Sequence, residues 1–323
     1  MHPADEQLAA TLATRNAERS LFSKVCAVRL PALRDRPLAY LLLLPSAVMI
    51  FTLIALPLAQ AFYFSFTNRS TLGGPYAFVG LENYLSLFQR PDFPQALRNS
   101  VVWTGGNLVL DMSLGLLVAI VLHCRFRFRG MARALVLFPY LIPTIVAVLV
   151  WRFMLHGLLG IVNYWLIDLH LISAPISWFG NPNRAMVSVV LVGVWKLFPF
   201  VVISLLGILQ SIPTEIYEAA KVDGANAIQE FWHITIPSIM PVFVITALLR
   251  TIWTWDNFDI IYLLTGGGPV TSTMTLPVFV YKEAFRQFRM GRAAAISVVT
   301  FCIMLILIIA YLRLYDKAES AQR

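Results

Sequence analysis

Several charged side chains stand inside long apolar stretches, and an ionisable group in apolar surroundings usually serves a function. They are Asp111, Arg152, Lys196, Arg250, Asp256 and Asp259. Arg152 is near the end of its stretch, and we expect its side chain to extend toward the polar interface. Asp111 lies mid-stretch and could be a partner for another helix or a ligand. Lys196 could contact a substrate, or it could pair with Asp256 or Asp259 to hold the helices together.

A second group of residues has the composition of a sugar site. Arg250, Trp253, Thr254, Asn257 and Ile261 follow helical spacing, so we expect them to share one face. Amide and hydroxyl groups can form hydrogen bonds with sugar hydroxyls, and an indole ring can pack on the apolar face of a sugar. The sequence has no paired acid and base, nucleophile or metal-ligand spacing that would indicate an enzyme. We therefore expect no catalytic residue and no metal site.

Membrane helices are the elements that must position these residues. Of the 323 residues, 59% are hydrophobic and 13% are charged, whereas about a quarter of an average soluble domain is charged. Six stretches are long enough to cross a bilayer, and each must be helical because lipid offers no partner for a free backbone amide. They are 38–66, 101–122, 134–155, 186–209, 239–264 and 294–314. Prolines within them, such as Pro143 and Pro199, predict kinks. The sequence thus predicts an all-α membrane protein.

The orientation of the spans follows from lysine and arginine in the connecting segments. The tail before the first span, the loop 123–133 and the C-terminal tail are all rich in these residues, so we predict that both termini are cytoplasmic. Cys26 and Cys124 should then be reduced thiols. The loop 265–293 is predicted to lie outside although it holds Lys282, Arg286, Arg289 and Arg292. The net charge of +8 reflects these flanking cations, and it does not indicate nucleic-acid binding.

The segment 211–241, between the fourth and fifth spans, is predicted to form a docking helix. Thr214 suits the N-cap position. Gly224 suits the left-handed residue that ends a helix, and a second short helix is expected at 226–232. Small alanines allow close approach of a partner, while Glu218 and Asp223 can accept charge-assisted hydrogen bonds. The simplest alternative is a solvated hairpin between two spans.

This segment also carries a family resemblance. Glu218-Ala219-Ala220-x-x-Asp223-Gly224-Ala225, followed by Phe231, Ile234, Pro237 and Pro241, resembles the EAA loop of binding-protein-dependent ABC importer permeases. The segments 78–84, 195–200, 263–269 and 291–297 are similar to the carbohydrate-uptake group, which is related to maltose and glycerol-3-phosphate permeases. The resemblance extends from about residue 38 to the end of the chain.

The resemblance implies a type I ABC importer transmembrane fold over 38–315, with cytoplasmic tails at 1–37 and 316–323. It implies that a partner ATPase acts on Glu218, Ala219, Ala220, Asp223, Gly224, Ala225 and Pro237. It also implies that the substrate pathway includes Lys196, Leu197, Phe200, Trp253, Thr254 and Asn257. The expected partners are a second homologous permease, two ATPase subunits, an extracytoplasmic solute-binding protein and membrane lipid. The chain has no Gly-x-x-x-x-Gly-Lys-Ser/Thr phosphate loop, so we expect no cofactor here and ATP in the partners.

We therefore predict a non-catalytic permease subunit of an ABC importer for a sugar or a related polyol or glycoside. Its location would be the cytoplasmic membrane of a bacterium or archaeon. One alternative is an importer for another solute class, such as amino acids, peptides or phosphate. Another is an ion-coupled secondary transporter, which would usually be longer or internally repeated. Lys196 and Arg250 leave an anionic substrate open.

Overall fold

The computed structural model describes residues 36–124 and 126–320, so the predictions for the tail at 1–35, including Cys26, lie outside the described residues. The chain divides into two compact units, Met1–Gln60 and Ala61–Arg323. In the first unit, α2 (Arg36–Ile50) leads through the π-helical turn η1 (Phe51–Ala55) into the start of α3 (Leu56–Ser65), whose residues from Ala61 onward belong to the second unit. The described part of this unit is therefore helical and apolar, as expected for a membrane span.

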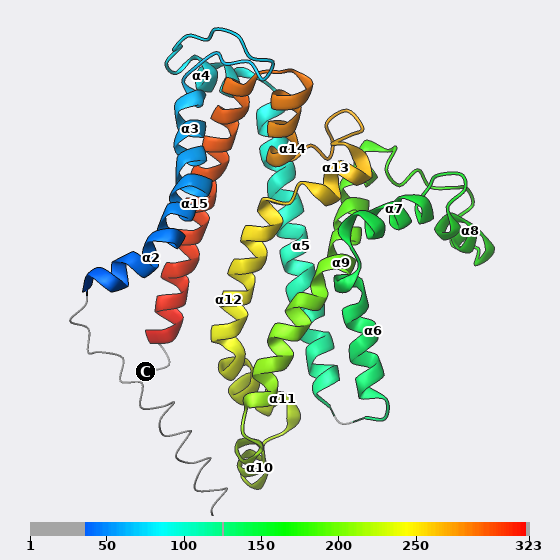
Figure 1. Ribbon diagram of the computed structural model, residues 1–323. Helices are drawn as coiled ribbons and strands as arrows, with labels where there is room; N and C mark the ends of the chain where they lie inside the picture. The colour runs from blue at the N-terminus through cyan, green and yellow to red at the C-terminus, as the bar shows by residue number, and fades with distance from the viewer. Residues whose placement is uncertain (1–35, 125, 321–323) are drawn as a thin grey trace, which may run out of the picture. The chain divides into compact units, whose positions relative to one another are not determined.

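The second unit is a helical bundle (Figure 1). Its longer helices are α5 (Asp92–His123), α6 (Arg129–Leu141), α7 (Thr144–Met154), α9 (Pro182–Ser211), α12 (Ile236–Trp255) and α15 (Met290–Ser320). Its shorter elements are α4 (Glu82–Gln89), α8 (Ile161–Asp168), α10 (Thr214–Val222), α11 (Ala227–Glu230), η2 (Phe231–Thr235), α13 (Asp259–Thr265), α14 (Leu276–Tyr281) and η3 (Lys282–Arg286). Over the described ranges the β-type pairing is one isolated bridge, between Thr67 and Phe78. The predicted all-α class is confirmed.

Five of the described helices are long and apolar enough to cross a membrane, and the count is six if the bent pair α6 and α7 forms one span. This agrees with the six predicted spans. The predicted fifth span, 239–264, is too long at its end, because α12 stops at Trp255 and α13 is a separate helix. Asp256, Asn257 and Phe258 therefore form a connection between two helices and are not part of one long helix.

The third span is broken. The axes of α6 and α7 differ by 95° across a break of two residues, Ile142 and Pro143. Pro143 has no backbone N–H to continue the helix and disfavours helical backbone at Ile142, which is extended (φ −67°, ψ 135°). The predicted kink at Pro143 is therefore a full break, and the predicted span 134–155 consists of two helices instead of one.

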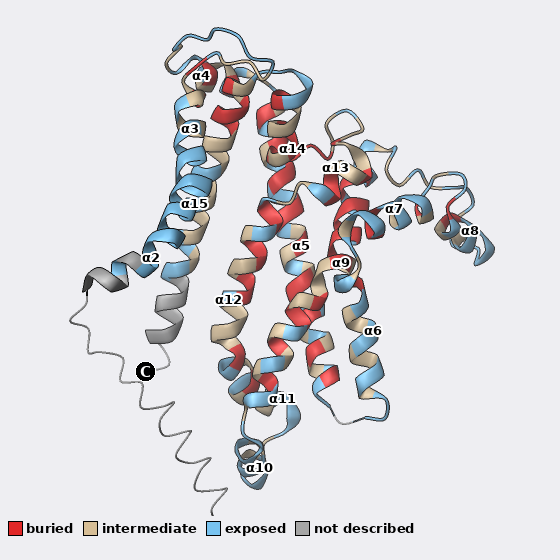
Figure 2. Ribbon diagram, viewed as in Figure 1, coloured by how far each residue is buried: buried red, intermediate tan, exposed pale blue. Residues whose placement is uncertain are grey.

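The core of the second unit is formed largely where α5 packs against α9, and Figure 2 shows buried residues along both helices and along α12. Glycines permit this close approach. A Cβ atom on Gly193 would lie 2.5 Å from the Trp103 ring and 2.6 Å from Asn107 Oδ1. A Cβ on Gly115 would meet the Val201 side chain at a similarly short distance. The backbones of α5 and α9 are thus held closer than larger residues would allow.

Candidate functional site: a docking loop and a membrane pathway

The docking helix α10 protrudes at one end of the bundle, between the end of α9 and the start of α11 (Figure 1). Its N-cap position is taken by Pro213, and Thr214 is the first helical residue. The prediction that Thr214 is the N-cap is thus wrong by one position. No residue of α10 is buried, so the helix presents its surface for contact with another molecule.

The end of α10 is a Schellman motif. Gly224 has φ +85°, and its N–H donates to the Lys221 carbonyl at 3.1 Å. The Ala225 N–H donates to the Ala220 carbonyl at 2.9 Å. A Cβ on Gly224 would meet no atom within 4 Å, so the position requires glycine for its backbone conformation and not for space. The predicted left-handed helix end at Gly224 is confirmed.

The predicted second short helix at 226–232 is not a separate element. Asn226 caps α11 through a capping box with Gln229, whose two hydrogen bonds measure 2.8 and 2.9 Å. The helix then continues through η2 into α12, which gives 29 residues from Ala227 to Trp255. Pro237 lies in the first turn of α12. One continuous helix therefore joins the docking loop, which comprises α10 and residues 223–226, to the middle of the bundle.

A side-chain contact attaches α10 to this continuous helix, because Tyr217 Oη and Thr235 Oγ1 are 3.0 Å apart. A groove with a volume of about 290 Å³ lies beside it. The residues that line the groove are Ala220, Asp223, Gly224, Ala225, Gln229, Glu230, His233 and Ile234. Four of the seven predicted coupling residues meet in this groove. Glu218 and Ala219 are exposed on α10, and Pro237 is exposed on α12.

The surface around the groove carries exposed apolar side chains, which are Ile216, Val222, Ile228 and Trp232. Exposed apolar residues grouped with carboxylates are typical of a protein interaction site. Such an arrangement can bind a protein partner. The groove lining includes the carboxylates of Asp223 and Glu230 and the imidazole of His233, and it has no serine, threonine, cysteine or lysine.

An aromatic row crosses three helices within the membrane-spanning region. The Phe200 ring on α9 lies 5.0 Å from the Trp253 ring on α12 and 6.2 Å from the Tyr140 ring on α6. Trp253 is 47% exposed and Tyr140 is 39% exposed, so both rings have open faces. Leu197, one turn from Phe200, is partly buried against the core. Sequence reasoning missed Tyr140, although its place between Pro139 and Pro143 marked an irregular segment.

The five residues predicted to share one face, from Arg250 to Ile261, do not do so. Ile261 lies in α13, beyond the end of α12. Arg250 and Thr254 are 2% and 1% exposed and point into the bundle, and the Thr254 carbonyl accepts the Trp103 Nε1–H at 2.8 Å. Trp253 and Asn257 remain accessible. Adjacent residues on a helix point about 100° apart, so one face could not hold both Trp253 and Thr254.

Asp111 and Arg250 form a buried ion pair between α5 and α12. The Arg250 Nε donates to Asp111 Oδ2 at 3.1 Å, and the Nη2 atom donates to the same oxygen. Asp111 is fully buried. The sequence left Asp111 open as a helix partner or a ligand, and the structure supports the first role. Because Asp111 neutralises Arg250, this arginine is already paired, whereas the sequence had left it open as a ligand for an anionic substrate.

Lys196 is almost fully buried, at 5% exposed. Its ammonium group donates to the carbonyl oxygens of Pro139, Tyr140 and Ile142 at 2.9, 3.0 and 2.5 Å. Among the ion pairs of the described residues, none joins Lys196 to Asp256 or Asp259, the pairing considered from the sequence. The reason is geometric, since Lys196 extends from α9 to the broken third span and not to α12 or α13.

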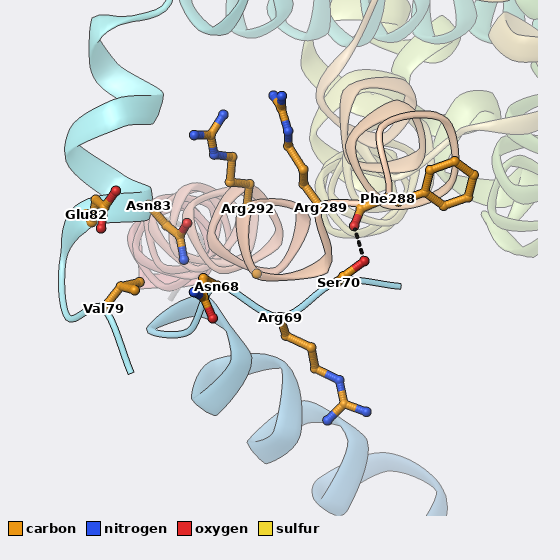
Figure 3. A pocket seen from close by; sticks show the side chains of 10 residues that line it. Asn68, Arg69, Ser70, Val79, Glu82, Asn83, Phe288, Arg289 and Arg292 are labelled. Carbon is orange, nitrogen blue, oxygen red and sulfur yellow. Dashed lines mark hydrogen bonds between the residues drawn. The ribbon is translucent and has the colours of Figure 1, made fainter. Parts of the chain in front are cut away.

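At the other end of the bundle from α10, two chain segments far apart in sequence enclose a polar cavity of about 350 Å³ (Figure 3). It is lined by Asn68, Arg69, Ser70, Val79, Glu82, Asn83, Phe288, Arg289, Gly291 and Arg292. Asn83 donates to the Ser65 and Thr67 carbonyls at 2.9 and 2.8 Å. A Cβ on Gly291 would collide with the Thr67 carbonyl. The segments 78–84 and 291–297 are two of those that resemble the carbohydrate-uptake group. They meet here and join the C-terminal end of α3 to α4 and α15.

Comparison with known proteins assigns this architecture to a family. The family model of the binding-protein-dependent transport system inner membrane component matches residues 112–321. The inner membrane ABC transporter permease protein YcjO of Escherichia coli K12 is 41% identical over 277 residues, which are 85% of this chain and 93% of that protein. The trehalose/maltose transport system permease protein MalF of Thermococcus litoralis is 36% identical over 283 residues, or 87% of this chain and 94% of that protein.

The sulfoquinovosyl glycerol transport system permease protein SmoG of Agrobacterium fabrum is also 36% identical, over 87% of this chain and 91% of its own length. Among solved structures, a bacterial ABC transporter involved in import of the acidic polysaccharide alginate contains a chain with the same fold. Its TM-score is 0.78 at 21% identity, over 88% of this chain and 97% of that one. The chain described here therefore belongs to the family of binding-protein-dependent ABC transport permeases of the inner membrane.

Proposed function

We propose that this chain imports a sugar, or a related polyol or glycoside, as the permease subunit of an ABC importer. The observation that carries the proposal is the row of Tyr140, Phe200 and Trp253, whose rings come from three different membrane helices. Aromatic rings pack on the apolar faces of sugar rings, and polar side chains beside the aromatic rings can then bind the hydroxyl groups at the edge of the sugar. Trehalose/maltose and sulfoquinovosyl glycerol permeases among the relatives support the same solute class.

In the proposed pathway, the sugar ring packs on the exposed faces of Tyr140 and Trp253. Asn257, which follows the end of α12, supplies a side-chain amide to bind hydroxyl groups. Leu197 and Phe200 form the apolar wall on α9. Thr254 and Lys196 are buried, Lys196 on α9 beside this wall and Thr254 on α12 beside Trp253. Because the row spans α6, α9 and α12, a relative movement of these helices would open or close it.

The proposed coupling surface is the docking loop. A cytoplasmic ATPase would bind over Glu218, Ala219, Ala220, Asp223, Gly224 and Ala225, while Pro237 lies at the base of the continuous helix. ATP would be bound by two such partner subunits, and this chain would contribute no catalytic residue or cofactor. A second, similar permease would complete the pathway. An extracytoplasmic solute-binding protein would deliver the sugar to the end of the bundle opposite α10.

The test is uptake by the complete importer in proteoliposomes, with its own binding protein and a panel of sugars. Trp253→Ala and Asn257→Ala should each lower the uptake rate by about tenfold, the effect of losing roughly 1.4 kcal/mol of contact. Trp165→Ala is the matched control, because Trp165 is an exposed tryptophan on α8, outside the row. An unchanged affinity for the sugar and an unchanged uptake rate in both pathway variants would contradict the proposal. So would a binding protein that takes amino acids, peptides or phosphate and no sugar.

A further inference from the structure

The break of the third span leaves backbone carbonyl groups without helical partners. The last carbonyls of any helix lack intrahelical donors. At the end of α6 this deficit cannot be met by the next helix, because Pro143 has no N–H and α7 turns away by 95°. In a membrane, each unsatisfied carbonyl costs several kcal/mol. These carbonyl groups must therefore be satisfied from outside the third span, by a side-chain donor of another helix or by water.

Lys196 supplies that donor. An ammonium group has three N–H bonds, and here three carbonyl oxygens accept them, those of Pro139, Tyr140 and Ile142. The group is nearly buried and has no further donor to offer a substrate. Lys196 thus joins the end of α6 to the middle of α9 through one side chain.

The same side chain lies behind the aromatic row. Phe200 follows Lys196 by four residues on α9, so the two share a helix face. Tyr140 is bonded to Lys196 through its carbonyl, and its ring lies 5.8 Å from the ammonium nitrogen and 6.2 Å from the Phe200 ring. We propose that Lys196 is a positioning residue that holds the Tyr140 ring beside Phe200 by tethering the broken end of α6 to α9.

Crosslinking measures the tether directly. In a chain with Cys26, Cys124 and Cys302 replaced by serine, the pair Tyr140→Cys and Phe200→Cys is joined by a short thiol-specific crosslinker. A protease site in the exposed loop after α8 reports the crosslink, because joined halves stay together after cleavage. Adding Lys196→Met should slow crosslinking by about threefold or more, since three hydrogen bonds are lost. An unchanged rate would overturn the proposal.

Two further variants guard against a simple folding defect. Lys282→Met also removes one lysine charge, but Lys282 lies in η3, away from the break, and crosslinking should stay at the starting rate. Lys196→Gln keeps one donor group and should give a rate between those of lysine and methionine. Equal slowing in the Lys282 variant would show a general loss of structure, and it would count against the tether.

The consequence for transport rests on the proposed function. Tyr140→Ala and Lys196→Met should lower sugar uptake to a similar extent, and combining them should add little, because both act on one ring. Fully additive losses would contradict the positioning role. If crosslinking slows and uptake stays normal, the tether is established and the transport role of the row fails. If crosslinking is unchanged while uptake of anionic solutes alone is lost, Lys196 is a substrate ligand and the proposal is wrong.

Discussion

Asp111 and Arg250 show how strongly an apolar interior constrains single residues. Each charge would be expensive alone in the membrane, and each is almost fully buried. Together they form two hydrogen bonds through one carboxylate oxygen. A buried pair of this kind adds little stability compared with well-packed apolar residues, but the loss of one partner leaves an uncompensated charge. The pair therefore fixes which side of α12 faces α5.

Removing one partner should destabilise the protein more than removing both. We expect Asp111→Ala to cost about 3–5 kcal/mol, because Arg250 would be left buried without a partner. The double variant Asp111→Leu/Arg250→Met should recover most of this loss. Thermal unfolding of the purified complex in detergent is the measurement. A double variant less stable than the single one would contradict the argument.

At the scale of elements, the contact between α5 and α9 depends on the absence of side chains. Gly193→Ala should push the two helices apart, because the new Cβ would overlap the Trp103 ring. The expected loss is about 1–3 kcal/mol. Gly207→Ala, on the same helix, is the control, since a Cβ there meets nothing within 4 Å. The comparison is the shift in unfolding temperature, and equal shifts at both positions would reject the packing explanation.

The docking loop permits a second element-scale prediction. Glu218→Lys reverses a charge on the exposed surface of α10, and Gly224→Val places a β-branched residue at φ +85°. Both should abolish the stimulation of ATP hydrolysis by the loaded binding protein, while the chain remains in the membrane at normal levels. Gly130→Val is the control, because that glycine has open space around it and ordinary backbone angles. Unchanged stimulation of ATP hydrolysis in both loop variants would show that coupling occurs elsewhere.

The sequence predicted those elements that depend on local information. Hydropathy located the spans, and the glycine in the docking loop marked its helix end, because both follow from neighbouring residues. The contacts of Lys196 and Arg250 were not predictable, since their partners are 54 to 57 and 139 residues away in the chain. Those contacts depend on how far each helix is rotated about its axis. A shift of one position along the helix turns the direction of the side chain by about 100°.

At the scale of the whole molecule, the orientation across the membrane is a prediction from charge. It implies that the loop after α5 and the loop after α13 face opposite sides. Cys124 lies in the first loop and is exposed. Val270 lies in the second and is 88% exposed. These two positions give a direct test.

A thiol reagent that cannot cross membranes should react with Cys124 only in inverted vesicles. This experiment uses a variant in which Cys26 and Cys302 are replaced by serine, so that Cys124 is the one remaining native cysteine. With all native cysteines replaced, Val270→Cys should react only in intact cells whose outer barrier has been opened. Labelling of both positions from the same side would show that the number of crossings between them is even. The reverse pattern would place the docking loop outside and exclude a cytoplasmic ATPase as its partner.

The continuous helix from Ala227 to Trp255 gives the molecule a mechanical property. At 1.5 Å per residue, its 29 residues form a rod about 43 Å long. One end is attached to α10 through Tyr217 and Thr235, and the other carries Trp253. A tilt of about 10° around the lower end would displace the upper end by roughly 7 Å, given that length. In the proposed importer the helix would therefore act as a lever arm, and a small rotation imposed at the docking loop would become a displacement large enough to separate Trp253 from Phe200.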